Sequence, residues 1–241
     1  MTAGSMARAA EAGHRVVAVF GTRGELGECP DDLAPGETLA DRRVRETERA
    51  AQLLGATRVA FLGYHDSGMA GSDTVDAPGA FAAADVDDAA ERLARLLREE
   101  QAEVLTVYDE RGGYEHPDHI QVHRVGVRAA ELAGTPRVYA ATVSADHFRE
   151  LAARTRAQDP SIEMPDPEEL NLGIPDARIT TRVDVTPFLA VKRASMAAHA
   201  SQIAEEAFFL AMPPDVFART FSTEWYERLD SRPAEPETWL L

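Results

Sequence analysis

The chain has 241 residues, 44% hydrophobic and 27% charged, which is typical of a folded globular protein and excludes a disordered or fibrous one. The 41 acidic residues outnumber the 25 basic ones and give a net charge of −16, which disfavours nucleic acids and anionic membranes as partners. No apolar run approaches the roughly 20 residues of a membrane-spanning helix. The single cysteine, Cys29, fits a reducing compartment, so we expect a cytoplasmic protein.

The first half of the chain alternates short apolar runs with amphipathic segments. We predict helices at 2–12, 40–54 and 86–100, and strands at 16–20, 59–62 and 104–107. This alternation indicates an α/β fold with a Rossmann-like, mostly parallel sheet and helices on both faces. Because such a sheet normally opens with a strand and this chain opens with a helix, we expect the first strand to be missing.

The second half is less regular. We predict a helix at 146–157, a Pro-rich and acidic loop or lid at 158–178, a strand at 179–185, a helix from Thr186 to about 204, and a frayed tail beyond Arg228. We therefore expect a single domain over 1–241, with a Rossmann-like part over 1–142 and a smaller C-terminal α+β part over 143–241.

The densest cluster of chemically active residues is YDERGGYEHPDH at 108–119, directly after the predicted strand at 104–107. It places His116, Asp118 and His119 at the carboxyl end of a strand, where ligands bind in open α/β sheets. Neutral imidazole and carboxylate are zinc ligands. The alternative is a capped strand–helix turn with incidental histidines. His123 lies one helical turn beyond His119, and we interpret it as a supporting or surface residue.

Two further loops follow the earlier strands. Asp66 and Met69 lie in GYHDSGMAG after the second strand, where Asp66 is placed either to bind a hydroxyl-rich ligand or to form an Asx turn. The loop at 22–28 has no glycine-rich phosphate pattern, so we reject dinucleotide binding. Arg43 and Glu46 are one turn apart, which by itself predicts a surface ion pair worth a few tenths of a kcal/mol.

Together these segments resemble the PIG-L/LmbE-like de-N-acetylase family, which includes deacetylases and a conjugate amidase of mycothiol metabolism. The resemblance rests on GHRVVAVFGTRGELGE, RVRETERAAQLLG, FLGYHDSGMAG and YDERGGYEHPDHIQVH, in the family's order. It implies a zinc-dependent hydrolase, with ferrous iron as the second candidate metal, acting on the amide of an N-acyl amino sugar or a thiol conjugate. The sequence leaves open whether the chain forms a homo-oligomer.

The resemblance also implies roles for individual residues. His119 would bind the metal, and His116 would stabilise the tetrahedral intermediate or protonate the leaving amine. Asp118 would fix the orientation of the imidazoles, and Tyr114 would polarise the substrate carbonyl. Residues expected to bind the substrate are Arg43, Asp66 and Met69.

The chain departs from the family pattern at one motif. The family draws its other metal ligands and its general base from an HPDDE motif on the first strand, whereas the only HPD triplet here is at 116–118. Either the start codon was assigned too late or the motif is truly absent, and we favour the first explanation because the substrate-side motifs are intact. For the chain as given we expect weak zinc binding and negligible activity. The alternative function is a metal-free binding protein that keeps the sugar-binding loops.

Overall fold

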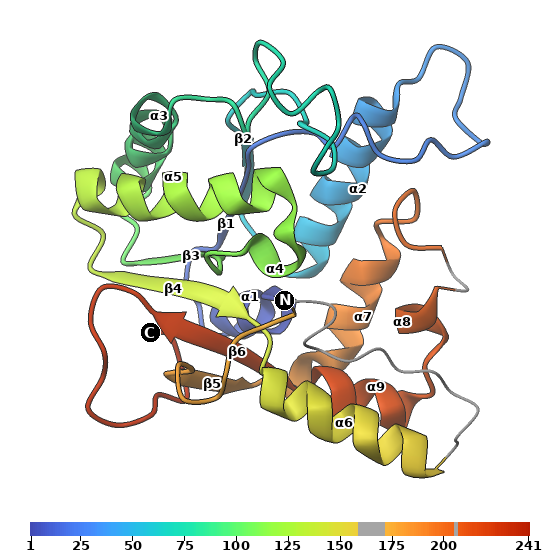
Figure 1. Ribbon diagram of the computed structural model, residues 1–241, viewed down its shortest axis with the longest axis vertical. Coiled ribbons are helices and arrows are strands. Elements are labelled where there is room, and N and C mark those ends of the chain that lie inside the picture. The colour runs from blue at the N-terminus through green and yellow to red at the C-terminus, as the bar shows by residue number, and fades with distance from the viewer. Residues whose placement is uncertain (159–171, 205–206) are drawn as a thin grey trace. The chain divides into compact units, whose positions relative to one another are not determined.

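The computed structural model describes residues 1–158, 172–204 and 207–241, and the chain divides into two compact units (Figure 1). Unit 1 comprises Met1, Val86–Asp184 and Thr223–Leu241, and unit 2 comprises Thr2–Asp85 and Val185–Ser222. These boundaries differ from the predicted division at residue 142. A single domain over the whole chain stays a prediction.

Unit 1 is built on a four-stranded sheet in the order β3-β4-β6-β5. Its elements are α3 (Val86–Glu99), β3 (Val104–Tyr108), α4 (Gly112–Glu115), α5 (Pro117–Ala133), β4 (Arg137–Thr142), α6 (Ala145–Gln158), β5 (Thr181–Asp184) and β6 (Thr223–Arg228). Strands β3 and β4 are parallel, with Tyr108 opposite Ala141, whereas β6 runs antiparallel to both β4 and β5. The parallel pair with α5 between its strands is a βαβ unit of the kind expected for the fold class, although the sequence analysis did not predict β4.

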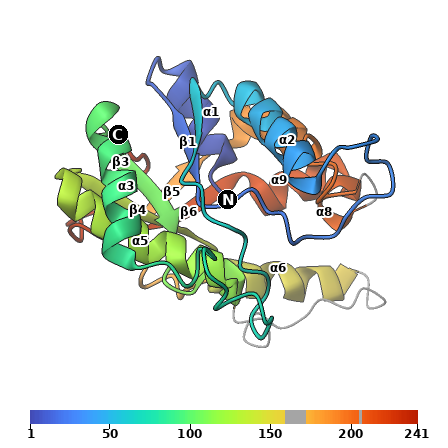
Figure 2. The same cartoon turned by 90° about the horizontal axis from the view of Figure 1, so that it is seen from above.

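Helices α3 and α5 pack side by side, and α5 also packs against β3 (Figures 1 and 2). The apolar face of α3 is buried through Leu93 and Leu97. Helix α5 approaches β3 closely at Gly126, where an added Cβ would lie 2.3 Å from Cγ1 of Val107. This close approach fixes the helix that carries His119 against the strand that precedes the candidate site.

Unit 2 contains a two-stranded parallel sheet and the remaining helices. Its elements are α1 (Ala3–Glu11), β1 (Val17–Phe20), α2 (Leu39–Leu53), β2 (Arg58–Phe61), the 3₁₀ helix η1 (Thr186–Phe188), α7 (Leu189–Ala197), α8 (Phe208–Ala211) and α9 (Pro214–Phe221). Helix α2 begins with a capping box in which Thr38 and Asp41 each accept from the other's main-chain N–H at 3.1 Å. Helices α1 and α2 both pack against α7.

The α/β class and the parallel pairing are confirmed, but the described strands form two sheets where we expected one. Within the described part of the chain, β1 pairs only with β2, and β3 pairs only with β4. Among the described residues, each of these apolar strands therefore has one side without a strand partner. Such an edge is a template for a further strand. The missing first strand stays a prediction.

Several predictions for the second half need correction. Residues 223–228 form β6, which the sequence analysis missed, and the tail is not frayed, since Leu240 is buried and the carboxylate of Glu237 accepts from Arg228 at 2.8 Å. Helix α7 ends at Ala197 and not near 204. Most of the predicted loop or lid at 158–178 lies outside the described residues.

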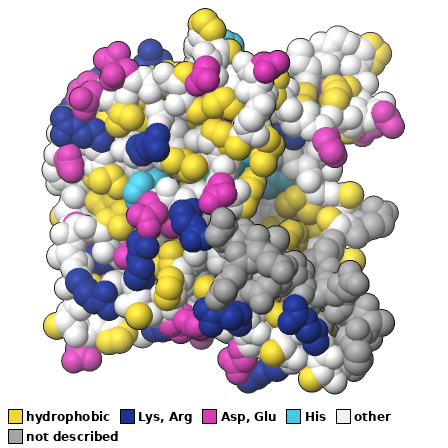
Figure 3. Space-filling model, viewed as in Figure 1, with side chains coloured by type: hydrophobic (Ala, Val, Ile, Leu, Met, Phe, Trp, Pro, Cys, Tyr) yellow, Lys and Arg dark blue, Asp and Glu magenta, His cyan; other side chains and the backbone are white. Residues whose placement is uncertain are grey.

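On the face in Figure 3, acidic and basic side chains are intermingled rather than gathered into a basic patch. Within the described ranges, no helix combines the length and the apolar character that crossing a membrane requires.

Candidate active site

The loop that leads from β3 to α5 is organised around the carboxylate of Asp109. This side chain is only 2% exposed. Its Oδ1 accepts from the main-chain N–H of Arg111 at 3.1 Å and of Gly113 at 3.0 Å, and its Oδ2 accepts from the hydroxyl of Thr142 at 2.7 Å. The carboxylate thereby ties the loop to the end of β4.

Two consecutive glycines give this loop its path. Gly112 and Gly113 have φ values of 67° and 77°, which glycine adopts without the steric cost that a Cβ brings. Gly112 also has no room for a side chain, because a Cβ there would lie 2.7 Å from the main-chain nitrogen of Ile120 and 2.8 Å from Cβ of His119. The glycine pair is therefore required by both backbone conformation and space.

The imidazole of His119 is held on three sides. Its Nδ1 lies 3.1 Å from the carbonyl oxygen of Gly112. Its ring stacks on Tyr108 with centroids 4.0 Å apart and planes 7° apart, and the ring of Tyr114 meets it edge-on at 5.1 Å. Because a carbonyl can only accept, Nδ1 must carry the proton, and in the neutral ring Nε2 keeps the lone pair. This is the form in which histidine binds a metal.

His116 is held in the opposite way. Its side chain caps α5, because its Nδ1 accepts from the main-chain N–H of Asp118 at 3.2 Å. An N–H can only donate, so the neutral ring carries its proton on Nε2. The two imidazoles lie 4.8 Å apart between ring centroids, inclined at 30°. The loop thus presents one imidazole whose Nε2 can donate a lone pair and a second whose Nε2–H can donate a hydrogen bond.

The structure places the remaining sequence-predicted residues of this loop as follows. Asp118 is buried and Tyr114 is 54% exposed, with its ring near both histidines. The partner seen at Nδ1 of His119 is the Gly112 carbonyl, so a role for the Asp118 carboxylate in orienting that ring stays a prediction. His123 is held by the carbonyl of Tyr108, with Nδ1 at 2.9 Å, which fixes α5 to the end of β3.

Sequence reasoning missed Tyr108 and Asp109. Burial raises the pKa of Tyr108 to about 12, so its phenol is neutral where it stacks on His119. The sequence marked these two residues only by their position, because they stand between an apolar strand and a glycine pair. Position alone could not say that one would stack on an imidazole and the other would hold the loop.

In unit 2, Asp66 and Glu25 join the two loops that follow β1 and β2. Asp66 accepts from the main-chain N–H of Leu26 at 3.1 Å and of Gly68 at 2.9 Å, and Oε1 of Glu25 accepts from the N–H of Asp66 at 3.1 Å. The Asx-turn alternative is therefore present at Gly68. Oε2 of Glu25 is buried without a hydrogen-bond partner in the described part of the chain. Met69 is exposed.

Arg43 lies under the same loop. Its guanidinium donates to the carbonyl of Gly24, a Cβ on Gly27 would collide with it, and its buried Nε has no hydrogen-bond partner among the described residues. The predicted Arg43–Glu46 ion pair is wrong. Glu46 is buried and accepts from the N–H and the hydroxyl of Ser201, at 2.8 and 2.6 Å, because α2 packs against α7 on that side.

The side chains that could bind a catalytic zinc are few in the described part of the chain. Within residues 1–158, 172–204 and 207–241, no group of three His, Cys, Asp or Glu side chains is arranged to hold a metal ion. A catalytic zinc takes about three protein ligands. His119 is prepared as one of them, so the described residues do not by themselves fit the cofactor that the resemblance implies.

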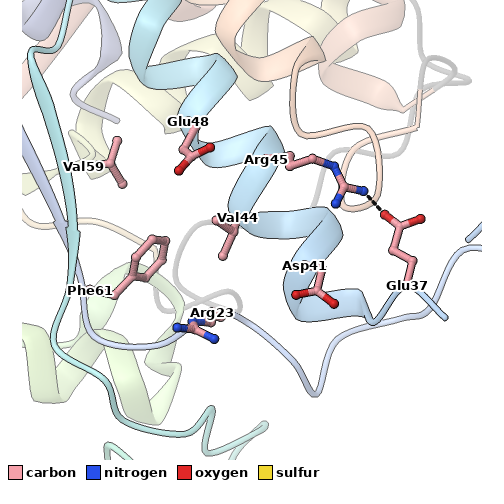
Figure 4. A pocket seen from close by; sticks show the side chains of 8 residues that line it. All are labelled: Arg23, Glu37, Asp41, Val44, Arg45, Glu48, Val59 and Phe61. Carbon is pink, nitrogen blue, oxygen red and sulfur yellow. Dashed lines mark hydrogen bonds and ion pairs between the residues drawn. The ribbon is translucent and has the colours of Figure 1, made fainter. Parts of the chain in front are cut away.

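A pocket of about 550 Å³ lies elsewhere in unit 2, beside α2 and β2 (Figure 4). Residues lining it are Arg23, Glu37, Asp41, Val44, Arg45, Glu48, Val59 and Phe61. Its carboxylates are largely engaged within the chain, since Glu37 bonds Arg42 and Arg45, and Asp41 bonds Thr38. We therefore assign it no ligand.

Glu37 offers a test of this charge cluster. Its hydrogen bonds from Arg42 and from the main-chain N–H of Ala34 lower its pKa to about 2. Because the folded-state pKa is depressed, the stabilisation is complete above the unfolded value of about 4.3 and is lost as pH falls toward 2. A carboxyl NMR titration should give a midpoint near 2, and Arg42→Gln should raise it. A midpoint near 4.3 in the unmodified protein would contradict this arrangement.

Comparison with known proteins agrees with the loop chemistry. The PIG-L family profile, described as GlcNAc-PI de-N-acetylase, matches residues 1–130. A 1D-myo-inositol 2-acetamido-2-deoxy-alpha-D-glucopyranoside deacetylase of Nocardiopsis dassonvillei is 39% identical over 250 residues, covering 95% of this chain and 89% of the relative. The prediction of a deacetylase-type amide hydrolase is thus confirmed at the level of the family.

Solved structures show the same fold at low sequence identity. The N,N'-diacetylchitobiose deacetylase of Pyrococcus horikoshii gives a TM-score of 0.58 at 19% identity, covering 95% of this chain and 78% of that one. The zinc-inhibited form of the teicoplanin deacetylase Orf2 gives 0.57 at 14% identity, covering 95% and 93%. From the family profile and the curated relative together, the chain belongs to the PIG-L family of de-N-acetylases.

Proposed function

We propose that this chain serves in the hydrolytic removal of the acetyl group from an N-acetylglucosaminyl-inositol. The observation that carries the proposal is the pair of histidines at the carboxyl end of β3, one with its Nδ1 against a carbonyl and the other with its Nδ1 against an N–H. The substrate is taken from the curated relative, whose name states an acetamido sugar joined to inositol. In this reaction water adds to the acyl carbon, the C–N bond breaks, and the products are acetate and a free amine.

The chain's own residues supply two parts of this chemistry. In the neutral ring, the Nε2–H of His116 can donate a hydrogen bond to the carbonyl oxygen as it becomes negative. The departing amine nitrogen must gain a proton to leave, and His116 can supply it only after its ring has first taken up the proton that the attacking water releases. The phenol of Tyr114, exposed beside both histidines, is proposed to donate to the carbonyl oxygen as negative charge develops on it. Stabilising the intermediate therefore needs only the neutral ring, whereas protonating the amine needs the imidazolium form of His116.

Arg43, Asp66 and Met69 are proposed to bind the sugar, as the family resemblance implies. Support comes from two buried polar atoms of one loop cluster that lack partners among the described residues, namely Nε of Arg43 and Oε2 of Glu25. A donor and an acceptor left unpaired in this way are groups that a hydroxyl-rich ligand would satisfy.

Zinc as cofactor also stays a proposal, as does ferrous iron. Because the described residues bring one prepared ligand rather than three, we propose that this chain holds zinc weakly and turns over negligibly without a large excess of metal. A cytoplasmic location and a small-molecule partner are proposed on composition and on the relatives' names.

Calorimetry and acetate release together test the proposal. N-acetylglucosaminyl-inositol should bind to the zinc-free chain, and Arg43→Gln should weaken binding about tenfold, the cost of one hydrogen bond to a charged group. The matched variant Arg42→Gln, on the same helix but bonded to Glu37, should bind normally. Unchanged binding in Arg43→Gln would contradict the proposed sugar contact.

The metal dependence separates an enzyme from a binding protein. With excess zinc, slow acetate release should appear and should fall about 100-fold or more in His119→Asn, since even residues that only support a ligand cost up to that much. The metal-free binding protein would be favoured if no acetate is released and if N-acetylglucosaminyl-inositol binds equally well with zinc, with a chelator and to the His119→Asn variant. Stoichiometric tight zinc with rapid turnover would overturn the proposed weakness of the site.

A further inference from the structure

One peptide group in the β3–α5 loop is hydrogen-bonded at both ends. Its N–H, from Gly113, donates to Oδ1 of Asp109 at 3.0 Å, and its C=O, from Gly112, accepts from Nδ1 of His119 at 3.1 Å. The two ends belong to one rigid plane, because the C–N bond has partial double-bond character. The orientation of the carbonyl that faces His119 is therefore set by what holds the N–H.

The carboxylate that holds the N–H is itself held by other hydrogen bonds. Asp109 is buried, its Oδ1 also accepts from the N–H of Arg111, and its Oδ2 is fixed by the hydroxyl of Thr142 at the end of β4. Thr142 lies in the sheet rather than in the loop. The carboxylate thus transmits the position of the sheet to the loop.

Such a constraint is needed because the backbone can adopt several conformations at these two glycines. Two successive glycines populate positive and negative φ about equally, so the plane between them has no intrinsic preference for the observed orientation. If the plane turned over, an N–H would face Nδ1 of His119 where the carbonyl now stands. That ring would then adopt the other tautomer, with its lone pair on Nδ1.

We propose that Asp109 is a positioning residue that fixes His119 in its Nδ1-protonated tautomer through the Gly112–Gly113 peptide group. The arrangement is a carboxylate–peptide–imidazole chain, in which the peptide stands between the acid and a ring that such carboxylates elsewhere contact directly. Each hydrogen bond polarises the next, which strengthens both. The claim about the tautomer stands on geometry alone, and only its purpose rests on the proposed function.

The test is a two-bond ¹⁵N–¹H correlation spectrum of the ¹⁵N-histidine-labelled protein, recorded well above the ordinary imidazole pKa, with His119 assigned by its loss in His119→Gln. The unmodified protein should show His119 protonated at Nδ1. In Asp109→Ala the Nδ1-protonated share should fall by at least half. In Asp109→Asn it should persist, because the amide oxygen can accept from Gly113 while the amide nitrogen donates to Thr142.

Thr142→Val is the matched control, since it removes a buried hydrogen bond from the same carboxylate but leaves the bond to Gly113. It should keep the His119 tautomer even where it lowers stability, because Oδ1 of Asp109 still accepts from the N–H groups of Arg111 and Gly113. Two results would overturn the proposal. One is a folded Asp109→Ala in which His119 stays protonated at Nδ1. The other is an Asp109→Asn in which this tautomer is lost as fully as in Asp109→Ala.

The amide spectrum shows whether each variant is folded. If Asp109→Ala is not, Asp109→Ser is measured instead, because its hydroxyl is too short to reach Gly113 and the same loss is expected. Acetate release plays no part in this result, so a failure of the proposed reaction and a failure of the positioning role remain distinguishable.

Discussion

Gly112→Ala is expected to lower the free energy of unfolding by about 2–5 kcal/mol and to displace the imidazole of His119. The new Cβ would meet the main-chain nitrogen of Ile120 at 2.7 Å and Cβ of His119 at 2.8 Å, and neither atom can move without moving α5. Left-handed backbone costs a non-glycine residue about 1–2 kcal/mol, and overpacking adds about 1–3 kcal/mol. Chemical denaturation measures the loss, and the ring-current shift of His119 on Tyr108 reports the displacement.

Gly134→Ala is the matched control for this prediction. Gly134 ends α5 with φ at 72°, close to that of Gly112, but nothing lies within 4 Å of its added Cβ. Gly134→Ala should therefore lower the free energy of unfolding by the backbone cost alone, about 1–2 kcal/mol. The His119 resonance should not move. Equal losses in the two variants would show that the close contact of Gly112 with α5 is not formed.

Glu46→Ala is expected to cost about 2–4 kcal/mol, far more than the few tenths of a surface ion pair. Its buried carboxylate accepts two hydrogen bonds from Ser201, and hydrogen bonds to a charged group contribute about 1.5–3 kcal/mol. Removing the acceptor also leaves the N–H of Ser201 without its partner. Urea unfolding of the variant should show the loss as a lower midpoint with an unchanged slope.

Glu48→Ala provides the comparison on the same helix, because Glu48 is exposed and should change stability by no more than about 0.5 kcal/mol. A double-mutant cycle with Ser201→Ala should give a coupling energy of at least about 1 kcal/mol. A Glu46→Ala loss as small as that of Glu48→Ala would mean that the link between α2 and the turn after α7 does not form in solution.

The sequence predicted the elements of the first half well because their signals are local. Alternating apolar runs and amphipathic spacing gave β1, α2, β2, α3 and β3 within a few residues. Strand β6 was missed because its pairing partners, β4 and β5, lie far from it in the chain, so no local pattern marks it. The tail was misjudged for the same reason, since Glu237 is held by residues such as Arg228 and Thr181.

The candidate site shows the same limit. Residue types and spacing singled out His116 and His119, but not which nitrogen of each ring carries the proton. That is decided by whether the partner is a carbonyl or an N–H, and hence by the orientation of a peptide group between two glycines. The Arg43–Glu46 spacing was equally uninformative, because each side chain bonds to a residue far away in the sequence.

The central claim is that the backbone prepares two neighbouring imidazoles for different tasks, and the tautomers of His116 and His119 in the unmodified protein test it most directly. The ¹⁵N–¹H correlation spectrum should show His119 protonated at Nδ1 and His116 protonated at Nε2, because Gly112 offers the first a carbonyl and Asp118 offers the second an N–H. Finding both rings in the same tautomer, or either one averaging between the two, would contradict the account.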